Sequence, residues 1–140
     1  WQFVSQDIFQ LGQKQFLITV DHYSDFYELD ELSNTLSAIV INHTKTHFAR
    51  HGIPVCCLTD NGPQFIPNEY RLFANKFGFE HATTSPYLSR SNDRAGAAVS
   101  DDKAIIKKSN DIYLALLNTR NTSPRCQNFS PVQHLMGRRT

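Results

Sequence analysis

The stretch that most constrains the fold is Val55 to Phe65, in which an apolar run ends on a carboxylate and then on a turn. Val55–Thr59 favours a strand, and Asp60 is followed at once by Asn61-Gly62-Pro63, which must turn. The pattern predicts a buried strand that delivers Asp60 to the edge of a sheet. Open α/β sheets place ligand chemistry at such strand ends. Asp also forms turns through its own local hydrogen bonds, so this stretch alone leaves two interpretations of Asp60.

Length and composition predict one globular domain over residues 1–140. The chain is 40% hydrophobic and 11% aromatic, which suits an α/β core. It has no apolar run near the roughly 20 residues of a membrane span and no signal-peptide pattern, so we expect no membrane partner. Its abrupt ends are typical of a domain excised from a longer protein. The net charge of +1 provides no global field for nucleic acid, so any basic surface is local.

Cysteine usage indicates a reducing compartment. Of three cysteines, Cys56 and Cys57 are adjacent in the predicted strand and Cys126 has no partner in sequence, which is a poor disulfide framework. Neighbouring strand residues point to opposite faces. We therefore expect Cys56 and Cys57 to be buried packing residues. No feature of the chain indicates a small-molecule substrate.

The order of periodic segments predicts a mixed sheet with helices. The first three strands form an antiparallel meander, because short links containing turn residues join them, and Asp7 lies inside the first. A helix follows with Ser33, Asn34 or Thr35 as candidate caps. We predict strands at 3–9, 16–20, 26–29, 55–59 and 79–83, and helices at 33–51, 67–77, 93–109, 112–117 and from 130 onward.

Three histidines share one face of the first predicted helix. His43, His47 and His51 are spaced four residues apart. Two histidines at this spacing are able to bind zinc, but no glutamate follows His43 to complete a His-Glu-x-x-His motif. The favoured interpretation is a solvated helix face.

Several segments together resemble the catalytic core of a gypsy-type LTR-retrotransposon integrase, in the family's order and spacing over essentially the whole chain. They are Val20-Asp21-His22-Tyr23-Ser24, Phe48-Ala49-Arg50-His51-Gly52-Ile53-Pro54, Leu58-Thr59-Asp60-Asn61-Gly62-Pro63-Gln64-Phe65, Lys107-Lys108-Ser109, Tyr113-Leu114-Ala115-Leu116-Leu117, Ser130-Pro131 and Leu135-Met136-Gly137-Arg138-Arg139. The resemblance implies an RNase H-like α/β fold: a mixed five-stranded sheet whose first three strands are antiparallel, flanked by helices on both faces.

The resemblance also implies a two-metal active site. The family uses two aspartates and a glutamate to hold two Mg²⁺ ions, or Mn²⁺, for transfer of DNA strands. Hard cations prefer oxygen ligands, and two ions about 3.5–4 Å apart stabilise the attacking and leaving oxygens at phosphorus. Asp7 matches the first family aspartate and Asp60 the second. We therefore expect their strands to lie side by side.

The third carboxylate is missing. The family places 35 residues between its second aspartate and its glutamate, and that position here is Gly96. Asp93, one turn earlier, has a shorter side chain and a place at the helix start, and Asp101 points elsewhere. Glycine inside a helix also costs about 1 kcal/mol. We predict an inactive integrase-like core with weakly bound metal; the alternatives are an active transferase with a displaced third ligand, or an interaction module derived from a transposon.

Basic residues on the long predicted helix indicate a local DNA contact. Lys103 and Lys107 share a stripe with Gly96, Lys108 is adjacent, and Arg90 and Arg94 lie near the helix start. In an integrase-like core this stripe would face DNA phosphates; the alternative is a solvated face. Weak or lost DNA binding, a homodimer and a nuclear location are further expectations that the resemblance implies.

Overall fold

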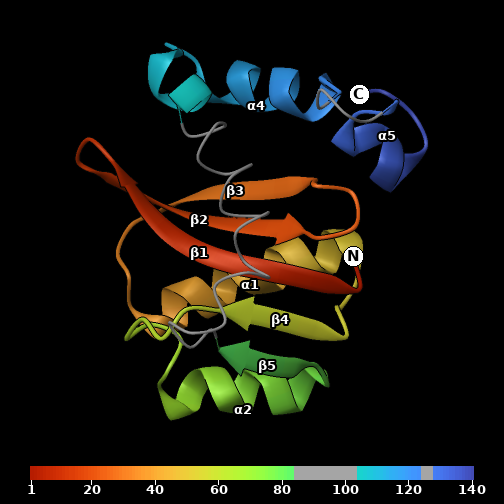
Figure 1. Cartoon of the computed structure of the whole chain (residues 1–140). Coiled ribbons are helices and arrows are strands. Elements are labelled where there is room, and N and C mark those ends of the chain that lie inside the picture. Colours follow the sequence, from red (N-terminus) through yellow and green to blue (C-terminus); the bar gives the residue numbers. More distant parts are fainter. Residues whose placement is uncertain (84–103, 124–127) are drawn as a thin grey trace.

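The computed structural model describes residues 1–83, 104–123 and 128–140. Its centre is a five-stranded sheet of order β3-β2-β1-β4-β5 (Figure 1). The strands are β1 (Phe3–Leu11), β2 (Lys14–Asp21), β3 (Tyr27–Leu32), β4 (Cys56–Thr59) and β5 (Glu80–Thr83), and the helices are α1 (Ser37–His51), α2 (Asn68–Phe77), α4 (Ile112–Asn121) and α5 (Pro131–Met136). Strands β1, β2 and β3 pair antiparallel, whereas β4 pairs parallel to both β1 and β5. The predicted mixed sheet with an antiparallel edge is confirmed.

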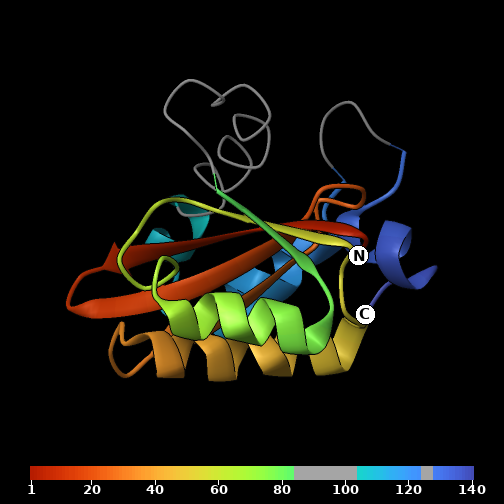
Figure 2. The same ribbon diagram turned by 90° about the horizontal axis from the view of Figure 1, so that it is seen from below.

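Side chains of β1 alternate between two hydrophobic layers. Val4 belongs to the core that packs under α1 and α2, which lie together on one side of the sheet (Figure 2). Phe9 belongs to a second core, which includes Leu116 of α4. Because successive strand residues point to opposite faces, Gln6 lies on the α1–α2 side. Ser5, Asp7 and Phe9 share the opposite side, which we call the carboxylate face.

Helix α2 begins and ends where its sequence predicts. Pro67 precedes it, and Gly78 ends it in the left-handed conformation at φ 77°, which glycine adopts without steric cost. Its predicted apolar stripe is buried at Tyr70, Phe73 and Ala74. The stripe is what fixes this helix against the sheet.

Helix α1 begins later than predicted. Its N-cap is Leu36, and none of Ser33, Asn34 and Thr35 caps it with a side chain. Asn34 Oδ1 instead accepts the N–H of Leu36 at 2.9 Å, which makes a turn just before the helix. The predicted cap is therefore wrong because the Asn34 oxygen is engaged in that turn.

The end of the long predicted helix is described from residue 104 onward. Residues 104–108 are helical, and Ile106 is buried whereas Ile105 is 48% exposed. Ile106 is therefore the side chain that packs this turn against the rest of the protein. Helices α4 and α5 follow as predicted, α5 with Pro131 in its first turn.

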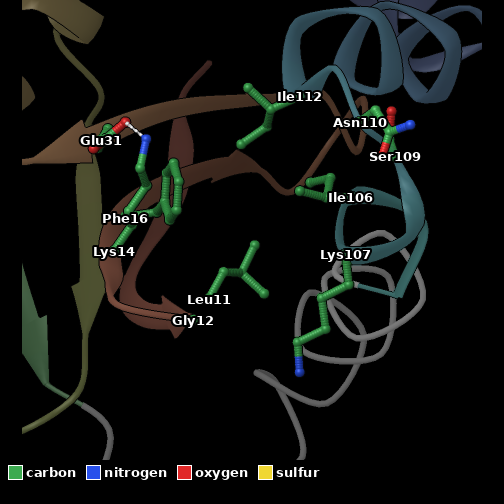
Figure 3. Close-up of a pocket in the computed structure, with 10 residues that line it drawn as sticks. All are labelled: Leu11, Gly12, Lys14, Phe16, Glu31, Ile106, Lys107, Ser109, Asn110 and Ile112. Carbon is green, nitrogen blue, oxygen red and sulfur yellow. Dashed lines mark hydrogen bonds and ion pairs between the residues drawn. The ribbon is translucent and has the colours of Figure 1, made fainter.

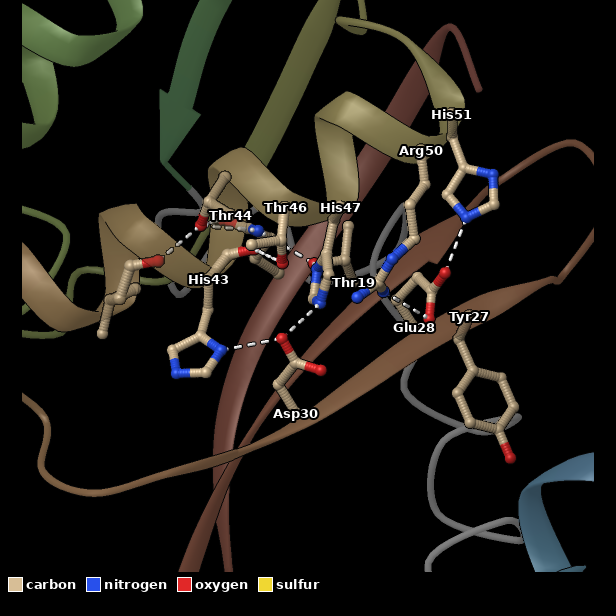
Figure 4. Close-up of polar contacts among 12 residues, drawn as sticks. Thr19, Tyr27, Glu28, Asp30, His43, Thr44, Thr46, His47, Arg50 and His51 are labelled. Carbon is tan, nitrogen blue, oxygen red and sulfur yellow. Dashed lines mark hydrogen bonds and ion pairs between the residues drawn. The ribbon is translucent and has the colours of Figure 1, made fainter. Parts of the chain in front are cut away.

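The three histidines of α1 face β3, not solvent. His47 is fully buried, with Nδ1 2.8 Å from Thr19 Oγ1 and Nε2 3.1 Å from Asp30 Oδ2 (Figure 4). His43 Nδ1 lies 2.7 Å from the same Asp30 oxygen, and His51 Nε2 lies 2.7 Å from Glu28 Oε1. The predicted solvated face is therefore wrong. Alternate β3 positions 28 and 30 present two carboxylates to this helix face, which sequence periodicity of α1 alone does not reveal.

The remaining fold expectations concern cysteines and membranes. Cys56 is 9% exposed and Cys57 is fully buried, which confirms both as packing residues; Cys126 lies outside the described residues. Among the helices of residues 1–83, 104–123 and 128–140, none is long and apolar enough to cross a membrane.

Candidate functional site

Asp7 and Asp60 lie on the same face of the sheet, on neighbouring strands. The parallel register pairs Ser5 of β1 with Leu58 of β4. Two residues further along, the same register brings Asp7 level with Asp60. Side chains at paired positions share a face, and Cys57 belongs to the core under α1 and α2, so Leu58 and Asp60 point to the carboxylate face. The expectation that the two strands lie side by side is confirmed.

Each carboxylate accepts a backbone N–H close to it in sequence. Asp60 Oδ1 accepts the N–H of Gly62 at 2.9 Å, and Asp7 Oδ1 accepts the N–H of Ile8 at 2.8 Å. Asp60 is exposed and Asp7 is half-buried. The strand therefore ends on an outward-facing carboxylate whose orientation is set by the turn that follows it.

The two aspartates are the described part of the predicted site. Within residues 1–83, 104–123 and 128–140, no three His, Cys, Asp or Glu side chains are placed to hold a metal ion. Gly96, Asp93 and Asp101 lie outside the described residues. Thr83, the last residue described before position 104, pairs with Thr59, which directly precedes Asp60. The donor set fits a hard cation, because both groups offer carboxylate oxygens.

A polar layer lies beneath the aspartates, on the α1–α2 side of the sheet. Gln6 precedes Asp7, and its Oε1 accepts the Tyr70 hydroxyl at 2.6 Å while its Nε2 donates to Thr19 at 2.9 Å. Thr59 precedes Asp60, and its hydroxyl lies 2.8 Å from His81 Nε2. Sequence reasoning missed this layer. The available signal was a polar residue at a core-facing position directly before each aspartate.

Burial keeps this layer uncharged at neutral pH. Desolvation raises the pKa of Tyr70 well above its ordinary value and the pKa of Cys57 to about 12. Burial also lowers the pKa of His81. Tyr70 therefore remains a hydroxyl donor, and His81 is a neutral imidazole.

The predicted DNA-contact residues are described in part. Lys107 and Lys108 are both exposed, whereas Arg90, Arg94 and Lys103 lie outside the described residues. Lys107 and Leu11 line one surface hollow of about 390 Å³ (Figure 3). Leu11 shares the face of Asp7 and follows it by four residues, about 13 Å along an extended strand. Lys107 therefore lies over the carboxylate face.

Comparison with known proteins finds retroviral relatives. No protein-family model matches the chain. The Gag-Pro-Pol polyprotein of sheep pulmonary adenomatosis virus is 26% identical over 117 residues, 81% of this chain and 7% of the polyprotein. Those of mouse mammary tumor virus (strain BR6) and squirrel monkey retrovirus are 28% and 31% identical over 88 residues, 62% of this chain and 5% of each polyprotein. The chain thus spans less than a tenth of these relatives.

Solved structures identify the fold. The catalytic core domain of BIV integrase superposes with a TM-score of 0.79 at 17% identity, over 97% of this chain and 94% of that one. A chain of the simian T-cell lymphotropic virus intasome, solved with the PP2A regulatory subunit B56 gamma, gives 0.78 at 20% identity, over 99% of this chain and 55% of that one. The predicted RNase H-like fold of integrase catalytic cores is confirmed.

Proposed function

We propose that this chain is an integrase-type catalytic core domain that has kept two of its metal ligands and lost strand-transfer activity. The observation that carries this proposal is the parallel β1–β4 register, which pairs Ser5 with Leu58 and, continued by two residues, brings Asp7 level with Asp60 on one face. The retroviral relatives and the integrase fold support the class of chemistry. Gly96 stands where the resembled family has its third carboxylate, and this is the reason for proposing inactivity.

Asp7 and Asp60 would hold a divalent cation, Mg²⁺ or Mn²⁺, through carboxylate oxygens. Such a cation supplies charge stabilisation at phosphate oxygens. The Gly62 N–H orients one Asp60 oxygen, which leaves the carboxylate less freedom to rotate. Two carboxylates supply enough oxygen ligands for one hard cation but too few for two cations. We therefore expect weak binding of one ion.

Strand-transfer assays on matched variants test the proposal. Labelled viral-end-like DNA with Mg²⁺ or Mn²⁺ should show no cleavage or joining by the natural chain. Gly96→Glu should restore tight metal binding in calorimetry and some strand transfer, because it returns the third carboxylate. Gly96→Gln is the matched control, since it has the same shape without the charge.

The same assay distinguishes the alternative of an active enzyme with a displaced ligand, such as Asp93. Robust activity of the natural chain that Asp60→Asn abolishes would contradict the proposed inactivity. Two tight Mg²⁺ sites in calorimetry would also favour the active enzyme with a displaced ligand. Activity that survives Asp60→Asn would remove this site from the chemistry altogether.

We also propose that the carboxylate face retains weak contact with DNA phosphates. Lys107 lies over this face, and Lys108 beside it is exposed; Arg90, Arg94 and Lys103 belong to the same proposal from sequence. Each neutralised phosphate contributes about 0.9 to the slope of log affinity against log salt. The double variant Lys103→Gln/Lys107→Gln should therefore lower that slope by the amount that about two phosphate contacts contribute. An unchanged slope would show that both lysines face solvent.

A second candidate role, as an interaction module, is favoured by exposed apolar side chains of α4. Tyr113 is 79% exposed, Leu114 54% and Leu117 41%, and contiguous exposed apolar side chains mark interaction sites. We propose that this helix supports a homodimer. Sedimentation at several concentrations checks it, and a strict monomer at high concentration would contradict it.

The gypsy-type origin and a nuclear location are proposed from sequence resemblance, and a fluorescent fusion in cells tests the location.

A further inference from the structure

The residue directly before each aspartate is held from the opposite face of the sheet. Gln6 Oε1 accepts the Tyr70 hydroxyl at 2.6 Å, and Thr59 Oγ1 lies 2.8 Å from His81 Nε2. Gln6 and Tyr70 are both buried, with Tyr70 fully so. Because strand side chains alternate between faces, Gln6 and Thr59 point away from the two carboxylates. Tyr70 and His81, which contact Gln6 and Thr59, therefore lie on the opposite face of the sheet, beneath Asp7 and Asp60.

Tyr70 and His81 also contact one another. Their ring centroids are 4.6 Å apart, and the rings are tilted by 54°. Tyr70 further packs edge-on against Phe65 at 5.4 Å, and the Phe65 N–H donates to Gly62 O at 3.0 Å. One aromatic pair therefore contacts β1, β4 and the end of the turn that follows Asp60.

The hydrogen-bond directions in this layer are determined by proton counting. Tyr70 has one hydroxyl proton, and the Gln6 carbonyl oxygen receives it. Gln6 Nε2 donates to Thr19 and to Thr44 at 2.9 and 3.1 Å, which fixes the orientation of the amide. Thr59 gives its single hydroxyl proton to the Asp60 carbonyl at 2.9 Å. The contact between Thr59 and His81 is therefore an Nε2–H donation from the imidazole.

We propose that Tyr70 and His81 are positioning residues, which set the mutual geometry of Asp7 and Asp60 by holding Gln6 and Thr59 from the far side of the sheet. The inference rests on the proposed function, because it assigns these residues to the cation site named there. A displacement of Gln6 or Thr59 moves the adjacent Cα, and with it the carboxylate on the other face. Loss of a partner that hydrogen-bonds a metal ligand directly costs about 10- to 100-fold in metal affinity. Tyr70 and His81 act one residue further from the ligands, so we expect a loss at the low end of that range.

Paired substitutions separate positioning from simple packing. His81→Leu keeps bulk and removes the donor, whereas His81→Gln keeps an amide N–H near the Nε2 position. Tyr70→Phe keeps the ring and removes the hydroxyl. Mn²⁺ affinity, measured by electron paramagnetic resonance under conditions in which every variant is folded, should fall about 10-fold in His81→Leu and in Tyr70→Phe. His81→Gln should recover most of that loss.

Glu80→Gln is the matched control, because Glu80 precedes His81 on β5 and is exposed. It should leave Mn²⁺ affinity unchanged. Equal affinity in the natural chain, His81→Leu and Tyr70→Phe would overturn the inference while leaving the proposed cation site intact. Loss of affinity that His81→Gln fails to recover would also overturn the assigned role of the His81 donor.

A second readout needs no metal, so it tests the positioning role even if the natural chain binds no Mn²⁺. Absence of Mn²⁺ binding by the natural chain would refute the proposed cation site itself. The amide signals of Asp60 and Gly62 in ¹H–¹⁵N spectra report the geometry of the strand end directly. His81→Leu should shift both signals, and His81→Gln should return them toward their natural positions. Unshifted signals in His81→Leu would overturn positioning by His81 regardless of metal.

Discussion

Gly62 shows how one residue without a side chain shapes the candidate site. A Cβ on Gly62 would lie 2.8 Å from Asp60 Oδ1 and 2.7 Å from Gln64 Nε2. Both atoms are the far ends of side chains, so a Cβ at this position would displace these side chains and leave the backbone in place. The glycine is therefore needed for the close approach of the Asp60 carboxylate to the turn.

We predict that Gly62→Ala weakens cation binding without destabilising the fold. The added methyl group displaces the Asp60 carboxylate from the Gly62 N–H. The turn is partly exposed at Gly62 and tolerates the change, so the free energy of unfolding should shift by about 0.5 kcal/mol or less. Mn²⁺ titration and urea unfolding measure the two effects. Natural affinity in the alanine variant would show that this carboxylate orientation is unimportant.

At the scale of elements, α4 depends on a cap at its first turn. Asp111 Oδ1 accepts the N–H groups of Tyr113 and Leu114 at 2.9 and 3.2 Å. Helix starts leave such N–H groups without partners inside the helix. The helix then packs through Leu116 on the second core, and Arg120 near its end donates to the Tyr27 carbonyl at 2.7 Å. Capping at one end and docking at the other hold α4 on the sheet.

Asp111→Ala should lower the free energy of unfolding by about 1 kcal/mol, the usual loss when a helix cap is removed. Asp111→Asn is the control, because asparagine caps about as well and carries no charge. Urea unfolding of both variants measures the effect. An equal loss in Asp111→Asn would assign the stabilisation to charge and not to the cap.

At the scale of the whole molecule, Glu28 of the edge strand joins helices that cover opposite faces. Its carboxylate lies 2.7 Å from His51 Nε2 of α1, and Arg120 of α4 donates to it at 2.9 Å. Burial opposes its ionisation, yet the His51 hydrogen bond and the charges of Arg120, His47 and Arg50 prevail. Together they lower the pKa of Glu28 from 4.5 to about 2.

This pKa predicts a specific acid sensitivity. A carboxyl group whose folded pKa is depressed stabilises the fold fully above its unfolded value of 4.5, and this stability is lost as the pH falls toward about 2. Glu28→Gln should therefore lower the free energy of unfolding at pH 7 by on the order of 3 kcal/mol. It should also flatten the dependence of that free energy on pH between about 2 and 5.

Urea unfolding from pH 2 to 7 tests the Glu28 prediction. Glu31→Gln serves as the control, because Glu31 pairs with Lys14 at 3.1 Å on the surface, where ion pairs contribute little. An equally steep acid limb in Glu28→Gln would show that other carboxylates carry the acid sensitivity.

The fold was largely predictable because its signals are local. Glycine and proline punctuate the segments around Gly52, Pro67 and Gly78, and the apolar stripe of α2 repeats with helical spacing. The histidine face of α1 was predicted wrongly for the opposite reason. His43, His47 and His51 look solvated until β3 supplies Asp30 and Glu28 from a distant segment.

By itself the sequence determined the order of strands and helices, the pair of candidate carboxylates, and glycine at position 96. Periodicity and turn residues act over a few neighbours, so they can be read along the chain. Only the tertiary structure decided that Asp7 and Asp60 share a face and that Tyr70 and His81 lie beneath them. Strand register and the packing of opposite faces join distant residues, because backbone pairing and burial act on the folded chain as a whole.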